Sequence, residues 1–403
     1  MKKPSSATLR VHVTPTADWK LRSGHPWLFS DSIQKQNREG KAGEFAIIYD
    51  RHDNFLGIGL YDPASPLRVR LLHRGKPQVI DDQWWRMHLH EAVSRRNAWF
   101  GTDTTGYRCI NGENERWPAL VLDRYGSTYV LKLYSAIWFL HLQKIVDILR
   151  SELHPERLVL RLSRNIQDHA RREHSLSDGD VLFGEPVREP VTFLENGLRL
   201  EADVIRGQKT GFFLDQRENR KFVGTLARGR EVLNCFSFSG GFSLYAARGC
   251  ASSVTDIDIS EHALESSRRN FALNNETPEI SQCQHEMIQA NTFEWLAKNA
   301  RKFDLIVLDP PSLAKREDER AGAIAAYEKL AGLGLEHLRP GGILVASSCS
   351  AHVNATEFFQ AVRKAATECK LRFEELQTTG HEIDHPATFP EGSYLKTISL
   401  RLV

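Results

Sequence analysis

Cysteine is scarce in this chain of 403 residues, which contains only six: Cys109, Cys235, Cys250, Cys283, Cys349 and Cys369. No two of them form a Cys-x-x-Cys pair, so the sequence predicts reduced thiols, with neither a disulfide framework nor a zinc site. Long hydrophobic runs are missing too. None approaches a membrane span, and the basic residues 2–3 are not followed by the apolar stretch of a secretory signal. We therefore expect a cytoplasmic protein that does not contact a membrane.

A strong excess of one charge is also missing, with 53 Lys and Arg against 51 Asp and Glu, but the charge is unevenly spread. Residues 1–100 hold 16 basic and 10 acidic side chains, which is a local excess of +6. This excess indicates a polyanionic partner for the N-terminal domain, although ordinary surface charge would explain the same count. The composition is otherwise typical of a folded globular protein, and the length predicts two or three domains.

Three segments differ in the secondary structure that their patterns predict. Residues 1–75 contain short strand patterns and predict an all-β domain, a small β-barrel. Residues 76–190 predict a mixed α+β middle domain that begins with a helix over 81–100. In residues 191–403, strand and helix patterns alternate after an Asn196-Gly197 hairpin signal, which predicts a doubly wound α/β sheet. No helix pattern separates the last two strands, so the last strand should be antiparallel.

Two buried strand patterns of the third segment end in reactive side chains. Residues 303–308 lead into Asp309-Pro310-Pro311, and residues 342–347 lead to Cys349. Since ligands bind at the edge where the carboxyl ends of parallel strands meet, we expect the Asp309 carboxylate and the Cys349 thiol to face one pocket. A thiol and an acid together suit covalent attack on a ring. An inert core thiol is the alternative, and the neighbouring serines argue against it.

Ligand-type residues follow four successive strand patterns of the same segment. A glycine turn comes first, then an acid, then a polar pair, then Asp-Pro. The turn is not Gly-x-Gly-x-x-Gly, which counts against a dinucleotide, and the acid stands where ribose hydroxyls can be bound. This order fits S-adenosylmethionine better than NAD, although Asp258 could instead only cap a helix. The predicted cofactor contacts are Phe236, Ser237, Gly240, Asp258, Ile259, Asn291, Thr292, Asp309 and Pro310.

The stretch 208–219 before the first of these strands is dense in polar groups around Gly211. Asp215 is a candidate N-cap of the helix that follows. The polar groups exceed what a cap requires, so we predict a loop that shapes the cofactor or substrate pocket. Lys209 and Thr210 are assigned to the cofactor, and Gln216 and Arg217 to the substrate.

The paired thiol and acid suit methylation of carbon 5 of a pyrimidine, a weak nucleophile that a thiolate adding at carbon 6 would activate. We predict Cys349 as the nucleophile, Asp309 as the acid that contacts the ring, and Pro311 beside the substrate. Methylation of exocyclic amines is associated with an aromatic residue after Asp-Pro-Pro, whereas Ser312 stands there. An RNA-binding assembly factor with a vestigial cofactor site is the non-enzymatic alternative. His381 and His385 lack a third ligand, so we expect no metal.

With these motifs the chain resembles, nearly end to end, the bacterial 23S ribosomal RNA (cytosine-C5) methyltransferases with an N-terminal PUA domain. The matching segments are residues 25–29, 61–66, 120–126, 208–219, 236–242, 309–311, 348–350, 384–386 and 390–392. The resemblance implies a class I (Rossmann-like) methyltransferase fold, S-adenosylmethionine as the donor and Cys349 as the nucleophile. It also implies 23S ribosomal RNA or a large-subunit precursor as the substrate, and it is compatible with a homodimer.

The resemblance further implies a basic RNA-binding surface on residues 1–75. We predict phosphate contacts from Arg68, Arg70, Arg74 and Lys76, aided by Trp27. Two departures are Asn291 and Asn234, which stand where many methyltransferases carry an acid. Related enzymes with a very similar 208–219 loop modify guanine, so methylation of a base nitrogen, on guanine or on an exocyclic amine, remains an alternative to cytosine carbon 5.

Overall fold

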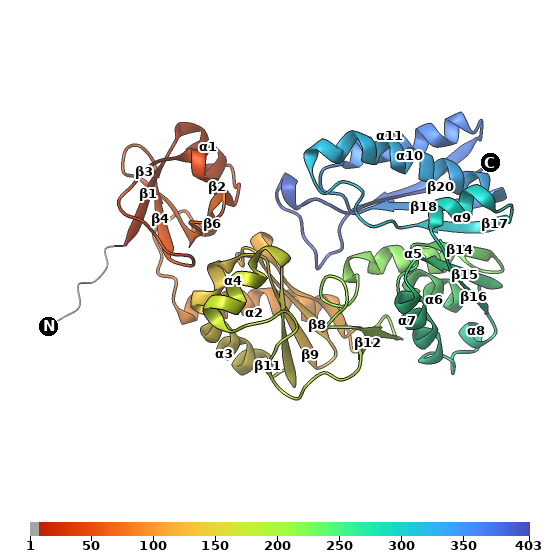
Figure 1. The fold of residues 1–403 in the computed structure, drawn as a ribbon, viewed down its shortest axis with the longest axis horizontal. Helices are drawn as coiled ribbons and strands as arrows, with labels where there is room; N and C mark the ends of the chain where they lie inside the picture. The colour runs from red at the N-terminus through yellow and green to blue at the C-terminus, as the bar shows by residue number, and fades with distance from the viewer. Residues whose placement is uncertain (1–7) are drawn as a thin grey trace. The chain divides into compact units, whose positions relative to one another are not determined.

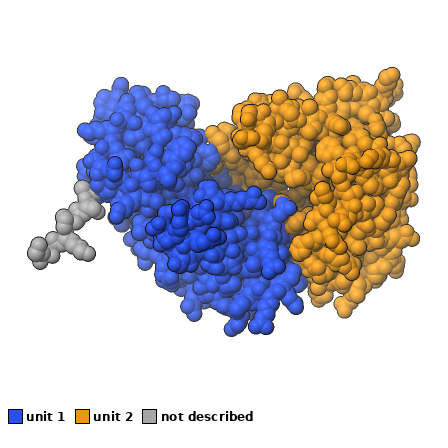
Figure 2. Space-filling view, in the orientation of Figure 1, with its two compact units in different colours: residues 1–196, 202–212 blue, residues 197–201, 213–403 orange. Residues whose placement is uncertain are grey.

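The computed structural model describes residues 8–403, which form two compact units (Figure 2). Unit 1 comprises the chain up to Asn196 together with Ala202–Phe212, and unit 2 comprises Gly197–Glu201 and Phe213–Val403. The sheets over residues 9–74 and 106–183 lie in unit 1, and the sheet over residues 231–402 lies in unit 2. The division at 75 and 190 stays a prediction, because the first two segments share one unit.

The N-terminal sheet of unit 1 is drawn in red to orange in Figure 1. Its strand order is β2-β6-β5-β4-β1-β3. Its strands are β1 (Leu9–Val13), β2 (Trp27–Phe29), β3 (Ile33–Gln36), β4 (Phe45–Tyr49), β5 (Phe55–Tyr61) and β6 (Leu67–Arg74). In β6 the side chains of Leu67, Val69 and Leu71 are buried, whereas Arg68 and Arg70 are half-buried. This alternation is that of a strand with one buried face, since successive side chains point to opposite faces of a sheet.

The expectation that residues 1–75 are all-β is wrong, because helix α1 (Pro15–Arg22) follows β1. The Thr14 hydroxyl caps this helix by accepting the Ala17 N–H at 3.2 Å, and Pro15 occupies the first helical position. The other residues of α1 are mostly polar, and Ala17 and Leu21 are its two buried residues. A helix of eight residues with two buried side chains gives little periodic signal in the sequence.

The second sheet of unit 1 has the strand order β11-β10-β9-β8-β7. Its elements are α2 (Asp82–Trp99), β7 (Gly106–Asn111), η2 (Gly112–Glu115), β8 (Leu120–Tyr125), β9 (Thr128–Leu133), η3 (Ala136–His141), α3 (Leu142–Leu153), β10 (Arg157–Leu162), α4 (Arg164–His174) and β11 (Val181–Phe183). Asp81 caps α2 by accepting the Trp84 N–H at 2.9 Å, and Asp82 is the first residue of the helix. Strand β7 and helix α4 were not expected.

Tryptophan side chains fill the core beneath this sheet. Trp85 of α2 packs against Trp117 and Trp138, with ring centroids 4.9 and 5.4 Å apart, and all three rings are fully buried. Further along the chain, strands β12 (Val191–Glu195) and β13 (Leu198–Ala202) flank Asn196 and Gly197. Both turn residues have positive φ, +49° and +81°, as a two-residue hairpin turn requires.

Unit 2 contains one sheet with the strand order β16-β15-β14-β17-β18-β20-β19. Its strands are β14 (Glu231–Cys235), β15 (Ser253–Asp258), β16 (Gln284–Gln289), β17 (Phe303–Leu308), β18 (Leu338–Ser348), β19 (Phe373–Thr379) and β20 (Lys396–Leu402). Strands β14 to β18 are parallel, whereas β20 pairs antiparallel with both β18 and β19. The predicted doubly wound sheet with an antiparallel last strand is confirmed.

Helices cover both faces of this sheet (Figure 1). They are α5 (Arg217–Leu226), α6 (Gly241–Arg248), α7 (Glu261–Ala272), α8 (Pro278–Ser281), α9 (Thr292–Lys298), α10 (Arg320–Glu336) and α11 (Ala355–Glu368). The sequence pattern near 280–285 is that of a strand, and β16 begins at Gln284, directly after the short helix α8. Within residues 8–403, no helix is long and apolar enough to cross a membrane.

Candidate functional site

The parallel strands of unit 2 bring the predicted ligand residues to one edge of the sheet. Cys235, the last residue of β14, pairs with Ile257 of β15 on one side and with Leu308 of β17 on the other. Leu308 pairs in turn with Ala346 of β18. The segments that follow these strands, with the glycine turn, Asp258, Asp309 and Cys349, therefore start from the same edge, where open α/β sheets bind ligands.

The glycine turn after β14 has an unusual backbone. Phe236, Phe238 and Gly240 all have positive φ, at +58°, +48° and +71°. A Cβ atom at Gly240 would lie 1.9 Å from the Ser267 hydroxyl, so only glycine fits there. Two non-glycine residues in the left-handed region are costly, and such strain accumulates at ligand sites. The Ser237 N–H, which donates to the Ile257 carbonyl at 3.0 Å, fastens the turn to β15.

The side chains around this turn match the chemistry of S-adenosylmethionine. The hydroxyls of Ser237 and Ser239 are buried and have no hydrogen-bond partner among the described residues. Ile259, just after β15, keeps 69% of its side chain exposed, which suits the flat apolar face of adenine. Buried polar groups are normally satisfied, so unmatched hydroxyls beside an exposed apolar residue indicate a ligand with both polar and aromatic parts.

Both carboxylate oxygens of Asp258 accept hydrogen bonds from backbone N–H groups. Oδ2 accepts the Phe238 N–H at 2.9 Å, and Oδ1 accepts the Ser260 N–H at 2.8 Å. The cap of α7 is the Ser260 side chain, which accepts the Ala263 N–H at 3.3 Å, so Asp258 is not merely a helix cap. Its carboxylate holds the glycine turn against the start of α7. Contact with ribose hydroxyls stays a prediction.

The third predicted cofactor segment starts helix α9. Asn291 is the N-cap of this helix, and its side-chain oxygen accepts the Glu294 N–H at 3.2 Å. Thr292 is 3% exposed. The oxygen that we expected to reach an adenine edge is therefore engaged in capping, and an adenine contact from Asn291 stays a prediction.

Asp309 is the first residue after β17 and belongs to a hydrogen-bond chain. Gln216 Nε2 donates to Asp309 Oδ1 at 2.9 Å, and Gln216 Oε1 accepts from Asn219 Nδ2 at 2.6 Å. Asn219 also donates to the Thr397 hydroxyl at 3.0 Å, which bonds the Ser347 hydroxyl at 2.8 Å. This series of hydrogen bonds links α5 to β18, to β20 and to the residue that follows β17. It sets the orientation of the Asp309 carboxyl group.

Cys349 stands directly after β18 and is half-buried. Its sulfur lies 4.0 Å from the carbonyl oxygen of Pro310, so the structure brings the Asp-Pro-Pro segment and the thiol together. Pro310 itself is buried, whereas Pro311 is exposed. Cys235 provides the contrast, since it is fully buried and burial raises the pKa of its thiol. Partial exposure of Cys349 favours a reactive thiol.

The serines on either side of Cys349 hold the surrounding loops. Ser350 Oγ accepts the Leu313 N–H at 3.0 Å and bonds the Tyr327 hydroxyl at 2.7 Å. The Ser348 hydroxyl donates to the same Tyr327 oxygen at 2.9 Å. Burial raises the pKa of Tyr327, which keeps its phenol neutral at ordinary pH. Helix α10 thus supports both residues that flank the thiol.

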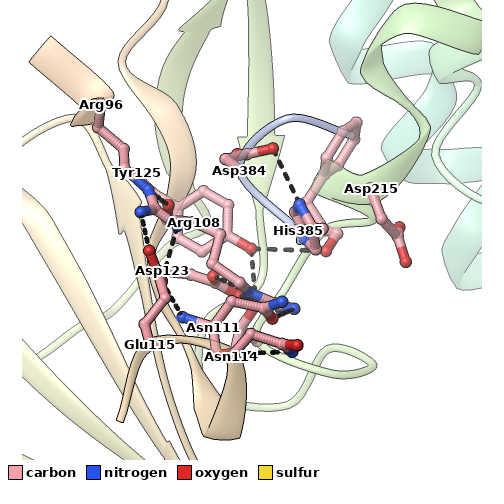
Figure 3. Close-up of polar contacts among 12 residues, drawn as sticks. Arg96, Arg108, Asn111, Asn114, Glu115, Asp123, Tyr125, Asp215, Asp384 and His385 are labelled. Carbon is pink, nitrogen blue, oxygen red and sulfur yellow. Dashed lines mark hydrogen bonds and ion pairs between the residues drawn. The ribbon is translucent and has the colours of Figure 1, made fainter. Parts of the chain in front are cut away.

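Lys209 and Thr210 lie in unit 1. The Thr210 hydroxyl donates to Asp123 Oδ2 at 2.6 Å and bonds the Tyr125 hydroxyl at 2.9 Å. Asp123 in turn accepts hydrogen bonds from Nε and Nη2 of Arg108, at 2.8 and 3.1 Å (Figure 3). Thr210 was predicted to contact the cofactor, whereas its hydroxyl lies in this buried network of unit 1.

Arg217 is buried in unit 2, with 1% of its side chain exposed, and pairs with Asp384 at 2.7 Å. His385 Nδ1 lies 2.9 Å from the other Asp384 oxygen, at the centre of the 384–386 motif (Figure 3). The predicted substrate contact thus forms a buried ion pair here. Asp215 does not cap α5: it lies in η4 (Leu214–Gln216) and its Oδ2 accepts the Tyr394 hydroxyl at 2.7 Å. Residues 8–403 contain no group of three or more His, Cys, Asp or Glu that could hold a metal.

The predicted RNA-binding residues of unit 1 fall into two groups. Arg74 and Lys76 are exposed at the end of β6. Trp27 and Arg70 both donate to Glu113 Oε1 of η2, at 3.0 and 2.8 Å. Their polar groups are therefore engaged within unit 1, by the segment between β7 and β8. Arg68 donates to the Pro63 carbonyl and lies over the Tyr61 ring, 5.8 Å from its centroid.

A doubly wound sheet with this glycine turn and this order of side chains defines a class I S-adenosylmethionine-dependent methyltransferase. Residues 161–392 match the family model of S-adenosylmethionine-dependent methyltransferases, and residues 11–74 match that of PUA-like domains. The chain belongs to the S-adenosylmethionine-dependent methyltransferase family and carries a PUA-like domain before its catalytic segment. Its cofactor is S-adenosylmethionine.

Two curated relatives span the whole chain. A protein of Deinococcus radiodurans named ribosomal RNA large subunit methyltransferase is 52% identical over 412 residues, covering 100% of both chains. Ribosomal RNA large subunit methyltransferase I of Aliivibrio fischeri is 32% identical and covers 98% of this chain and 100% of its own. Among solved structures, a candidate methyltransferase from Streptococcus mutans aligns with a TM-score of 0.81 at 22% identity, over 97% of this chain and 99% of its own, which shows the shared fold.

Proposed function

We propose that this methyltransferase modifies carbon 5 of a cytosine in the RNA of the large ribosomal subunit, 23S ribosomal RNA in a bacterium. In this proposal Cys349 is the covalent nucleophile and Asp309 contacts the ring. The full-length relatives named for large-subunit ribosomal RNA support the substrate class. The observation that carries the chemistry is the position of the half-buried Cys349 sulfur, 4.0 Å from the Pro310 carbonyl beside Asp309.

The proposed reaction begins when the Cys349 thiolate adds to carbon 6 and forms a carbon–sulfur bond. The displaced electron pair makes carbon 5 enamine-like, and Asp309 favours this addition through contact with ring N3 or the exocyclic amine. S-adenosylmethionine, when bound, supplies the electrophilic methyl group that carbon 5 takes. A base then removes the carbon 5 proton, the carbon 5–carbon 6 double bond returns, and the thiolate leaves. Gln216 keeps the Asp309 carboxyl group oriented through the hydrogen bond described above.

The same proposal assigns RNA contacts to the PUA-like domain. Arg74 and Lys76 are exposed, and the domain lies in the basic first quarter of the chain. Phosphate contacts of this kind supply affinity without sequence information, so the choice of nucleotide would come from the catalytic unit.

The decisive experiment uses ribosomal RNA from cells that lack the protein, methylated in vitro and analysed as nucleosides by mass spectrometry. Wild type should form 5-methylcytidine, and Cys349→Ala should form none while S-adenosylmethionine binding by calorimetry is retained. Cys369→Ala is the matched control, since Cys369 lies at the C-terminal end of α11 and should be dispensable. A methylated base nitrogen, or full activity in Cys349→Ala, would overturn the covalent mechanism. Absence of cofactor binding in wild type would favour an assembly factor.

A covalent adduct can be observed directly with RNA that contains 5-fluorocytosine. Fluorine replaces the carbon 5 proton, so the last step cannot occur and the carbon–sulfur bond persists. Wild type should shift to a higher mass on a denaturing gel, and peptide mapping should find the adduct on Cys349. A shift that persists in Cys349→Ala would assign the attack to another residue.

A further inference from the structure

Lys396, the first residue of β20, is a buried lysine next to the strand that carries Cys349. It pairs in register with Ser348, the last residue of β18, and only 3% of its surface is exposed. Lysine is rarely buried to this degree unless its charge is paired. Among the described residues, Lys396 forms no ion pair with a carboxylate, and its polar contacts are all with backbone carbonyl groups.

These carbonyl groups belong to the segment that follows the thiol. The Lys396 ammonium donates to the carbonyl oxygens of Ser350 and Val353, and to that of Tyr394 at 3.0 Å. Ser350 is the residue directly after Cys349, and Val353 ends the same turn before α11. One side chain therefore fixes the backbone just after Cys349 to the start of β20, with all three ammonium protons engaged.

Lys396 pairs in register with Ser348 and donates to the carbonyl group of Ser350, the residues on either side of Cys349, so its charge lies beside the segment that carries the thiol. Burial lowers the pKa of Lys396 to about 8, and the thiol of Cys349 and the carboxylate of Glu357 act in the opposite direction. Interaction between two titrating groups is mutual: if the thiolate stabilises the ammonium group, the ammonium group stabilises the thiolate equally. Cations near a cysteine promote the thiolate, which is the reactive form.

Other titratable groups lie near the thiol or near Lys396. From α10 comes Tyr327, whose phenol stays neutral because burial raises its pKa. From α11 comes Glu357, and its negative charge is neutralised by Arg320. After β17 comes Asp309, whose carboxyl group is engaged with Gln216.

We propose that Lys396 is a positioning residue that fixes the Cys349 segment at the sheet edge and favours the thiolate form of Cys349. The inference rests on the proposed role of Cys349 as the nucleophile. Lys396 takes no part in bond formation. It acts through the charge and the backbone contacts that it supplies to the nucleophile.

The test measures the reactivity of the thiol itself, so it requires no RNA. The full chain is treated with iodoacetamide at pH 6 to 10, and mass spectrometry follows alkylation of the peptide that contains Cys349, with Cys250 in the same digest as an internal reference. Lys396→Met keeps the length of the side chain and removes the charge, and Lys396→Arg keeps the charge. We expect the midpoint of the Cys349 profile to rise by about 1 pH unit or more in Lys396→Met, which lowers the rate near neutral pH roughly tenfold, and to stay near the wild-type value in Lys396→Arg.

Equal midpoints in wild type and Lys396→Met would overturn the proposal, as would a shift in Lys396→Arg as large as that in Lys396→Met. Should Lys396→Met fail to fold, the wild-type profile alone decides, because a Cys349 midpoint at or above about 8.5, the ordinary value for a thiol, contradicts a stabilised thiolate. The result is separable from the proposed function. If Cys349 is not the nucleophile, Cys349→Ala retains methylation whatever the alkylation midpoints are. If it is, Lys396→Met should lower kcat with little change in KM.

Discussion

Gln216 donates a hydrogen bond of 2.9 Å to Asp309, although the two residues are 93 positions apart in the sequence. The contact joins the polar segment before α5 to the Asp-Pro-Pro segment after β17. Gln216 is in turn held by Asn219, so its amide cannot turn without breaking a second hydrogen bond. Gln216 was predicted to contact the substrate, and Asp309 was predicted to contact both the cofactor and the ring. The hydrogen bond between them shows that Gln216 orients Asp309.

Removal of the Gln216 amide should therefore impair methyl transfer more than cofactor binding. In Gln216→Leu the Asp309 carboxylate loses a fixed donor, which costs about 1–3 kcal/mol and lowers turnover by roughly 5- to 150-fold. Steady-state methylation assays give kcat, and calorimetry gives the affinity for S-adenosylmethionine. Gln282→Leu, at an exposed position after α8, is the control. Turnover equal to wild type would show that the orientation of Asp309 is unimportant.

Thr210 offers a test of stability against cofactor binding. Thr210→Val keeps the shape of the side chain but removes the hydroxyl that bonds Asp123 and Tyr125. Since both partners are buried, the free energy of unfolding should fall by about 1–3 kcal/mol, and Thr210→Ser should restore most of it. Urea unfolding provides the measurement. A variant that is as stable as wild type yet binds S-adenosylmethionine weakly would instead support the cofactor contact expected from the sequence.

Glu382 should make the stability of unit 2 depend on pH. Burial raises the pKa of Glu382 to about 8 from an ordinary value of 4.5. A raised pKa means that the folded state holds the proton more tightly, so this contribution to stability is complete below about pH 4.5 and is lost as the pH rises to about 8. In that pH range, the free energy of unfolding of Glu382→Gln should therefore rise relative to that of wild type by up to about 1.4 kcal/mol per pH unit.

Urea unfolding of wild type and Glu382→Gln at pH 5, 6, 7 and 8 checks this expectation. Glu276→Gln, on the exposed surface, should keep a constant difference from wild type across the same range. A constant difference for Glu382→Gln as well would mean that Glu382 titrates normally in the folded protein.

The exposed basic residues after β6 should contribute to RNA binding through phosphate contacts. Arg74→Ala and Lys76→Ala should each reduce the slope of log affinity against log salt by about 0.7–0.9 and weaken binding to different RNA sequences alike. Fluorescence anisotropy over a range of KCl concentrations measures the slope. Lys329→Ala, on the exposed face of α10, should leave it unchanged. Slopes equal to wild type in both test variants would remove these residues from the RNA surface.

Much of the site was readable from the sequence because parallel strands impose order. Buried runs over 303–308 and 342–347 predicted two neighbouring strands, and the residues that follow them had to share an edge. The same logic located the glycine turn and Asp258. All of these ligand residues share one edge of the sheet, but their order along it differs from their order in the chain, because the strand order β16-β15-β14-β17-β18 reverses direction after β14.

Contacts between distant segments were not readable in the same way. Thr210 meets Asp123 across 87 positions, and Arg217 meets Asp384 across 167. Thr210 and Arg217 lie in the polar stretch 208–219, which suggested ligand contacts. The local sequence does not distinguish a side chain that is paired within the protein from one that binds a ligand. Lys396 was not predicted as a functional residue for a similar reason. In the sequence it is a polar residue at the start of a strand, and its burial results from the insertion of β20 beside β18.

That insertion has a consequence during synthesis. Among the strands of residues 8–403, β19 pairs with β20 alone, and β20 is the second neighbour of β18 after β17. In a nascent chain that has left the ribosome only as far as β19, this strand therefore lacks its partner β20. The segment after Cys349 also lacks its hydrogen bonds from Lys396. Truncation of the last strand should release two neighbours at once, so an incomplete copy would also lose the ammonium contact that holds the segment after Cys349.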